Sequence, residues 1–194
     1  MTTDNTAPVD SAAVPALPEA LAALTRHEFC HDYDDENDEY LGVDYEPYDA
    51  FSDAAEIHDW LVAWTGNAGL TPAGPTVAEL PVLPFAQDGA GGQAALWLVR
   101  EGRPLAEQPV VFLGSEGETG VIAPHAAALL WLLAEGVGPR EAVEWDEPAG
   151  REDPGLLALA LRHAPGPRRT AAEVVAAARA EFPDFEDTVG LLCR

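Results

Sequence analysis

The fold is decided by residues 80–99, which have the sequence LPVLPFAQDGAGGQAALWLV. Val82–Phe85 and Ala94–Val99 are short apolar runs, and Asp88–Gly92 between them is rich in turn-forming residues. Short apolar runs bounded by Gly and Asp are typical of buried strands. The stretch therefore predicts two neighbouring strands joined by a tight turn.

The same pattern continues toward the C-terminus. Pro109–Leu113 and Thr119–Ala123 are two further apolar runs, and turn-forming residues at 101–104 and 114–118 precede them. Several short strands at regular spacing with turns between them indicate sequential antiparallel pairing. We therefore expect an antiparallel meander in the middle of the chain.

Helical patterns flank the predicted sheet. After it, Pro124 is expected to open a helix that ends near Gly136, and two more helices are expected at about 154–163 and 171–182. The last of these begins with the capping box Thr170-Ala-Ala-Glu173.

Before the sheet, a short helix is expected at about 19–29, and a second one follows a cap at Ser52 or Asp53 and ends at Gly66. In the second helix the large apolar residues recur at helical spacing, which predicts a stripe that packs in the core. Its members are Ile57, Trp60, Leu61 and Trp64.

Helices followed by strands and then by helices predict the α+β class. The expectation is a single domain over residues 19–194, with an antiparallel sheet flanked by helices. Residues 1–18 are rich in Ala, Pro, Thr and Asp without periodicity, and they predict a disordered tail.

The charge of the chain is strongly acidic and unevenly distributed. The formal net charge is −24, and residues 1–99 carry 18 acidic residues against a single basic one, Arg26. Such a field repels phosphate backbones and anionic membranes and favours cationic partners. We therefore expect no nucleic-acid or membrane partner.

Residue types that are rare or missing narrow the function further. The chain has no Lys, which excludes a P-loop lysine, a Schiff-base lysine and a kinase-type lysine. The chain has only two cysteines, Cys30 and Cys193, and such a low number is typical of proteins from a reducing compartment. No signal peptide or membrane-spanning run is recognisable, so we expect a cytoplasmic protein.

One short motif suggests catalysis. His27-Glu28-Phe29-Cys30-His31 matches H-E-x-x-H, which places two zinc ligands and a general base on one helix turn. Zinc needs a third protein ligand, but positions 34 and 37, where the extended motif has Gly and His, hold Asp34 and Asn37. Two surface histidines at the end of an amphipathic helix are the preferred interpretation, with no metal bound.

Residues 30–50 form an acidic run in which tyrosines alternate with carboxylates. An EF-hand register from Asp32 fails, because Asn37 and Val43 stand where Gly and Glu are needed. A solvated, self-repelling loop and a surface for a cationic partner both remain open. The predicted partner-binding residues are Asp34, Asp35, Glu36, Asp38, Glu39, Tyr40 and Tyr45.

The order of elements from 80 to 136, and more loosely from 45 to 66, resembles the SUKH superfamily of bacterial toxin-immunity proteins and fungal cell-wall regulators. The resemblance lies in a strand ending in Pro84-Phe85, the Asp-Gly-x-Gly turn after it, and a strand ending in Ile122-Ala123 that runs into an apolar helix. It implies a SUKH-like α+β fold without catalytic activity or cofactor. It also implies binding of a specific toxin, often a nuclease.

Three functions follow as hypotheses. The preferred one is a non-catalytic protein-binding module, an immunity protein that neutralises a cationic nuclease toxin through the acidic surface. The second is a zinc-dependent hydrolase or peptidase that uses His27, Glu28 and His31. The third is a housekeeping scaffold with no toxin partner.

Overall fold

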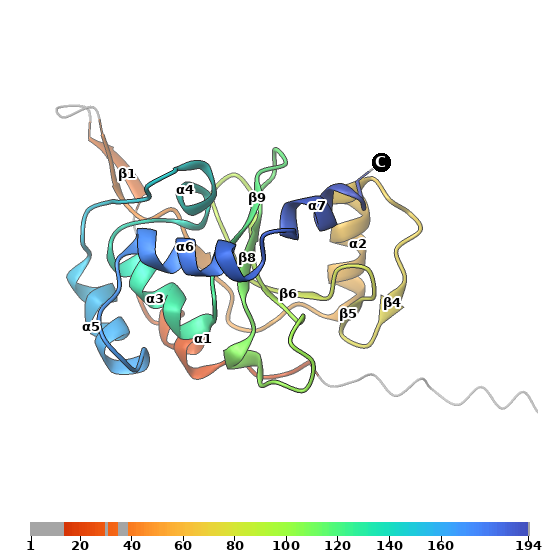
Figure 1. The fold of residues 1–194 in the computed structure, drawn as a ribbon, viewed down its shortest axis with the longest axis horizontal. Coiled ribbons are helices and arrows are strands. Elements are labelled where there is room, and N and C mark those ends of the chain that lie inside the picture. Colours follow the sequence, from red (N-terminus) through yellow and green to blue (C-terminus); the bar gives the residue numbers. More distant parts are fainter. Residues whose placement is uncertain (1–13, 30, 35–38, 194) are drawn as a thin grey trace, which may run out of the picture.

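The computed structural model describes residues 14–29, 31–34 and 39–193 (Figure 1). Its centre is a five-stranded antiparallel sheet with the strand order β3-β6-β7-β8-β9. The strands are β3 (Glu46–Pro47), β6 (Val82–Gln87), β7 (Gln93–Trp97), β8 (Val110–Leu113) and β9 (Thr119–Ala123). The predicted meander and the α+β class are confirmed, and β3 adds an edge strand from the acidic run.

The turn between β6 and β7 requires glycine. Gly91 has a φ of +88°, and a Cβ on Gly92 would lie 2.5 Å from the ring of Phe112 on β8. The Asp88 carboxylate completes the turn by accepting hydrogen bonds from the backbone N–H groups of Ala90 (3.0 Å) and Gly92 (2.7 Å). The Asp-Gly-rich sequence thus aligns two strands and leaves room for Phe112.

A proline inside β6 is accommodated by an irregularity in the ladder. Pro84 pairs with Ala95, but the register shifts before Ala86, so Phe85 is left out of the β6–β7 pairing. The Phe85 carbonyl instead accepts a hydrogen bond from the Tyr48 N–H at 2.8 Å. Because proline cannot donate to a ladder, strands tolerate it at such irregularities.

Both faces of the sheet are covered, which explains why its central strands are largely apolar (Figure 1). One face packs against α1 (Glu19–Leu24), α3 (Ala126–Ala134) and α5 (Pro154–His163). The other face is covered by α2 (Ala54–Thr65) and by the two-stranded ribbon of β4 (Pro72–Ala73) and β5 (Thr76–Val77). The helices α6 (Ala171–Glu181) and α7 (Phe185–Gly190) run along β9.

The helix ends follow the predicted capping chemistry. Asp53 caps α2 with a capping box to Glu56, and Gly66 ends this helix with a φ of +67°. Thr170 and Glu173 form the predicted capping box of α6. His125 caps α3, because its Nδ1 accepts the N–H of Ala128 at 3.1 Å. Among the described helices, none is long and apolar enough to cross a bilayer.

Three expectations about helices need correction. The first helix ends at Leu24 instead of near residue 29. The stripe of α2 is only half in the core: Ile57 and Leu61 are buried, whereas Trp60 and Trp64 are half-buried and stack with ring centroids 6.0 Å apart. Three short helical segments were not predicted, namely η1 (Leu105–Glu107), α4 (Pro139–Glu144) and α7.

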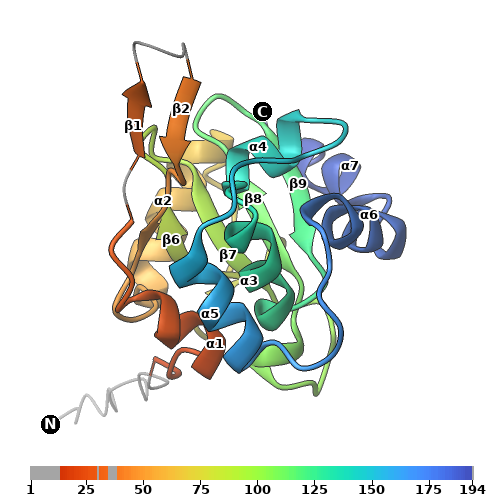
Figure 2. The same cartoon turned by 90° about the vertical axis from the view of Figure 1, so that its left-hand side faces the viewer.

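The acidic run and the N-terminal tail, which the sequence predicts to be irregular, also differ from expectation. The acidic run contains an antiparallel hairpin of β1 (His31–Asp34) and β2 (Glu39–Gly42), which Figure 2 shows projecting from one end of the molecule. Of the predicted disordered tail, residues 1–13 lie outside the described residues. Leu17 is described, and it is partly buried against the core.

The segment after α3 doubles back on the end of that helix at very close range. Gly136 has a φ of +72°, and a Cβ there would lie 2.1 Å from the carbonyl oxygen of Arg151. Gly102 has nearly the same φ, +68°, with no atom within 4 Å of a Cβ. A substitution at Gly102 therefore tests the cost of backbone strain alone. The same substitution at Gly136 tests backbone strain together with a steric clash.

We predict that Gly102→Ala lowers the free energy of unfolding by about 1–2 kcal/mol, the cost of a left-handed non-glycine residue. Gly136→Ala should lower it by about 2–5 kcal/mol, because the backbone of Arg151 must also move. Urea denaturation of both variants measures the difference. Equal losses would show that the close approach contributes nothing.

Candidate functional site

Four of the predicted binding residues are described by the structure: three lie on the β1–β2 hairpin, and Tyr45 lies where the chain leaves it. Asp34 ends β1 and pairs in register with Glu39, and Tyr33 pairs with Tyr40 one step closer to the body. Asp35, Glu36 and Asp38 lie outside the described residues. The register therefore places three of the predicted residues, Asp34, Glu39 and Tyr40, on one two-stranded ribbon.

Tyr45 does not belong to this surface. Its side chain is 2% exposed, and its ring lies 4.8 Å from that of Phe29, measured between centroids. Burial raises the pKa of its hydroxyl above the ordinary value. Tyr45 is thus part of the core, and its ring is not available on the surface.

The described residues of the zinc motif do not form the helix that the zinc interpretation requires. His27 follows the end of α1, and His31 opens β1, so the two residues do not share a helix turn. His27 instead packs edge-on against Phe29 and faces Asp153, with 3.8 Å between Nε2 and Oδ2. Within the described ranges, no three His, Cys, Asp or Glu residues are grouped so that they could hold a metal ion.

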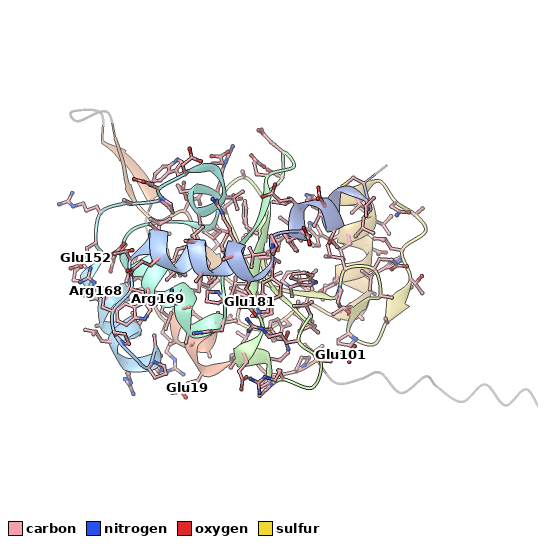
Figure 3. All side chains as sticks on the ribbon, viewed as in Figure 1. Glu19, Glu101, Glu152, Arg168, Arg169 and Glu181 are labelled. Carbon is pink, nitrogen blue, oxygen red and sulfur yellow. The ribbon has the colours of Figure 1, made fainter. Side chains whose placement is uncertain are left out.

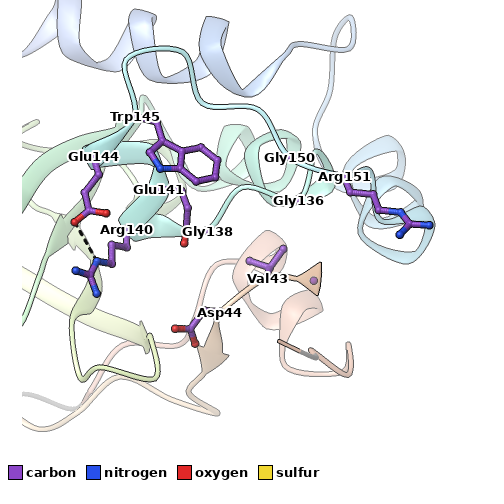
Figure 4. A pocket seen from close by; sticks show the side chains of 11 residues that line it. Val43, Asp44, Gly136, Gly138, Arg140, Glu141, Glu144, Trp145, Gly150 and Arg151 are labelled. Carbon is purple, nitrogen blue, oxygen red and sulfur yellow. Dashed lines mark hydrogen bonds and ion pairs between the residues drawn. The ribbon is translucent and has the colours of Figure 1, made fainter. Parts of the chain in front are cut away.

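A cavity of about 390 Å³ lies where the hairpin meets α4. Figure 4 shows the end of β2 on one side of this cavity and the α4 segment on the other. Its lining residues are Gly42, Val43, Asp44, Gly136, Gly138, Arg140, Glu141, Glu144, Trp145, Gly150 and Arg151.

Arg140 on α4 is surrounded by carboxylates. It contacts Glu144 through Nε at 3.1 Å, and through Nη2 it contacts Glu118 at 3.0 Å and Glu116 at 4.0 Å. The hydrogen bond to Glu144 is the main cause that raises the pKa of Arg140. Because one guanidinium serves three carboxylates, this part of the surface keeps a negative charge.

Asp44 ties the foot of the hairpin to the sheet. Its Oδ1 accepts the N–H of Gly89 at 2.8 Å, within the turn that follows β6. The neighbouring Asp88 is 3% exposed, and burial, followed by repulsion from Asp44, raises its pKa. Two carboxylates thus converge beneath the hairpin.

Trp145 is the residue of this site that the sequence analysis missed. It follows the last residue of α4, is 44% exposed and lies on the rim of the cavity. The exposed residues Glu144, Asp146 and Glu147 surround it in the chain. Gly138-Pro139 is a usable helix-start signal for α4, but nothing in the local pattern distinguishes an exposed Trp from a core one.

Comparison with models of protein families, with curated proteins and with solved structures finds no match for this chain. The residues of the site are therefore the guide to function. Their arrangement offers carboxylates and one large exposed aromatic ring beside a cavity, which is a surface suited to binding.

Asp88 provides a test of the turn beneath the hairpin. Asp88→Ala leaves two backbone N–H groups without their acceptor and should lower the free energy of unfolding by about 2 kcal/mol at pH 7. Asp88→Asn keeps an acceptor oxygen and should cost less than about 1 kcal/mol. Chemical denaturation of both variants measures the difference.

The effect of Asp88→Asn on stability should also change with pH, in a direction that the pKa of Asp88 determines. Because the pKa of Asp88 is raised in the folded state, the folded protein holds this proton to a higher pH than the unfolded chain. Ionisation therefore costs wild-type stability as the pH rises from about 4 through the folded pKa. The stability of Asp88→Asn relative to wild type should increase over this window, and a constant difference would contradict the raised pKa.

Proposed function

We propose that this protein acts without catalysis, by binding a cationic partner protein through its acidic end. The acidic end is defined as the β1–β2 hairpin together with α4, Trp145 and the Glu116–Glu118 turn. The observation that carries the proposal is Trp145, 44% exposed beside a cavity and flanked in the chain by exposed carboxylates.

Charge and aromatic surface would have separate roles in this binding. Carboxylates attract a cationic partner over distance and raise the association rate, whereas a large aromatic ring contributes affinity once water is excluded. The excess of carboxylates around Arg140 supports the first role. The exposed face of Trp145 supports the second.

We further propose that the partner is the nuclease domain of a bacterial toxin, and that the protein is its cytoplasmic immunity protein. The resemblance of residues 80–136 to the SUKH superfamily supports the proposal that the partner is a toxin. Carboxylates also suit a nuclease cleft, because such clefts are built to attract phosphate. A toxin and its immunity protein are expected to be encoded by neighbouring genes, which gives a direct source for the partner.

We predict that Trp145→Ala weakens binding of the purified partner by about 30-fold, the usual loss for a central aromatic contact. Leu191→Ala is the matched control, since Leu191 is 86% exposed near the C-terminus, by α7 and away from the hairpin (Figure 1). Calorimetric titration measures both affinities. An unchanged affinity for Trp145→Ala would exclude this surface as the binding site.

Neutralising the hairpin should slow association. With Asp34, Asp35, Glu36, Asp38 and Glu39 changed to Asn or Gln, we expect the association rate constant at low salt to fall about 10-fold. The difference should disappear at high salt, because salt screens exposed charges. Stopped-flow measurements over a salt series provide the test.

A control variant changes the net charge equally at other places. Glu101 lies at the end of the molecule away from the hairpin (Figure 3), and the other control residues lie on α2 and in or next to α7. All five are exposed, and they are Asp59, Glu101, Asp184, Glu186 and Asp187. Equal slowing by both variants would assign the effect to net charge instead of to the hairpin.

The toxin hypothesis has its own test in growing bacteria. The product of the neighbouring gene should stop growth when expressed alone, and co-expression of this protein should restore growth. Trp145→Ala should restore it less well than Leu191→Ala at equal expression. The immunity role would be contradicted if the neighbouring gene product were not toxic. It would also be contradicted if co-expression of this protein or of its variants made no difference to growth.

A further inference from the structure

A second cavity, of about 420 Å³, lies between α1 and α5, away from the hairpin (Figure 2). The two helices run antiparallel: Glu19 at the start of α1 faces His163 at the end of α5, and His27 after α1 faces Asp153 at the start of α5. The lining residues are Glu19, Ala22, Ala23, Arg26, His27, Gly155, Leu159, Arg162 and His163.

The dipeptide Arg-His occurs at both ends of this groove. Arg26-His27 follows α1 beside Gly155, and Arg162-His163 ends α5 beside Glu19. Each histidine faces one carboxylate: His27 Nε2 is 3.8 Å from Asp153, and His163 Nδ1 is 3.3 Å from Glu19. The antiparallel helices thus give the groove two similar ends.

The two arginines are unlike most cations of this protein. Among the residues that the structure describes, the guanidinium groups of Arg26 and Arg162 have no ion-pair or hydrogen-bond partner, whereas those of Arg140 and Arg168 each contact two or more carboxylates. With a net charge of −24 there is no shortage of carboxylates for them. Both guanidiniums are exposed and therefore keep their donors available.

The groove between the two ends is lined by apolar residues. Ala22, Ala23 and Leu159 line it, and Gly155 lies against His27, where a Cβ would be 2.9 Å from the ring. A cation near the C-terminus of a helix is favourable in itself. That effect can explain why an arginine stands at the end of each helix. It does not explain why small residues and a cavity lie between the two arginines.

We propose that this groove binds a slender dianion with one carboxylate at each end and an apolar spacer. Arg162 lies seven positions after Gly155, so the two ends are about 10 Å apart along α5. Each guanidinium would hold one carboxylate in a forked, charge-assisted contact. The rest of the acidic surface repels anions, which restricts such a ligand to this place.

Two sources offer this chemistry. A free dicarboxylic acid of medium length has it. So does a peptide in the polyproline II conformation with two glutamates three residues apart, because three residues per turn place both side chains on the same side with a span of about 9 Å. Octanedioate and the peptide acetyl-Glu-Ala-Ala-Glu-amide are the respective probes. Butanedioate, which is too short, and octanoate, which has one carboxylate, are the matched controls.

The experiment is a titration of the full-length protein with each probe, followed by nuclear magnetic resonance of the backbone amides of α1 and α5. We expect saturable shifts with octanedioate, and affinities at least 10-fold weaker for butanedioate and octanoate. Arg26→Gln and Arg162→Gln should each weaken octanedioate at least 10-fold. Arg103→Gln is the control, because Arg103 pairs with Glu107 outside the groove.

Some outcomes identify the source of the ligand, and others would overturn the proposal. Binding of octanedioate without the peptide assigns a small dicarboxylate, and tighter binding of the peptide assigns an acidic segment of a protein. Within the described residues, neither guanidinium has an ion pair or hydrogen bond to lose, so both variants should stay folded, with at most the small loss of a favourable helix-end charge; circular dichroism checks this. No saturable binding by either probe, or binding that survives both variants, would overturn the proposal.

Discussion

The structure depends on a sheet that has to be covered on both faces. Its central strands carry apolar residues on both sides, and β8 is buried along its whole length. Helices must therefore pack on both faces, since an uncovered face would leave large apolar surfaces in water. The same need for close packing excludes any side chain at Gly92, where Phe112 lies directly on the backbone.

Much of this arrangement is predictable from residue patterns, because burial on both faces produces apolar runs with clear turns. The strands from Val82 to Ala123 and the helices at 154–163 and 171–181 follow in this way. The pattern fails where elements are short or carry acids. Helices α4 and α7 have six residues each, too few for a helical period to emerge. The β1–β2 ribbon is rich in residues that are depleted in strands, so it resembles a solvated loop.

The candidate site was only partly predictable for the same physical reasons. Net charge alone indicates the acidic surface, since charge does not depend on the fold. The position of Tyr45 was missed, although Val43 and Tyr45 are buried around the half-exposed Asp44, an alternation typical of a strand. Trp145 and the groove between α1 and α5 depend on which helices pack together. No local pattern carries that information, because their residues meet only through tertiary contacts.

The distribution of tryptophans has a spectroscopic consequence. Of the five in the chain, all within the described part, Trp131 is buried, Trp60, Trp64 and Trp97 are half-buried, and Trp145 is exposed. Trp145 is therefore the indole most accessible to a collisional quencher. Its carboxylate neighbours would repel iodide but not neutral acrylamide, so the ratio of the two quenching constants reports the local potential. The protein thus carries a natural fluorescent probe at the rim of its acidic cavity.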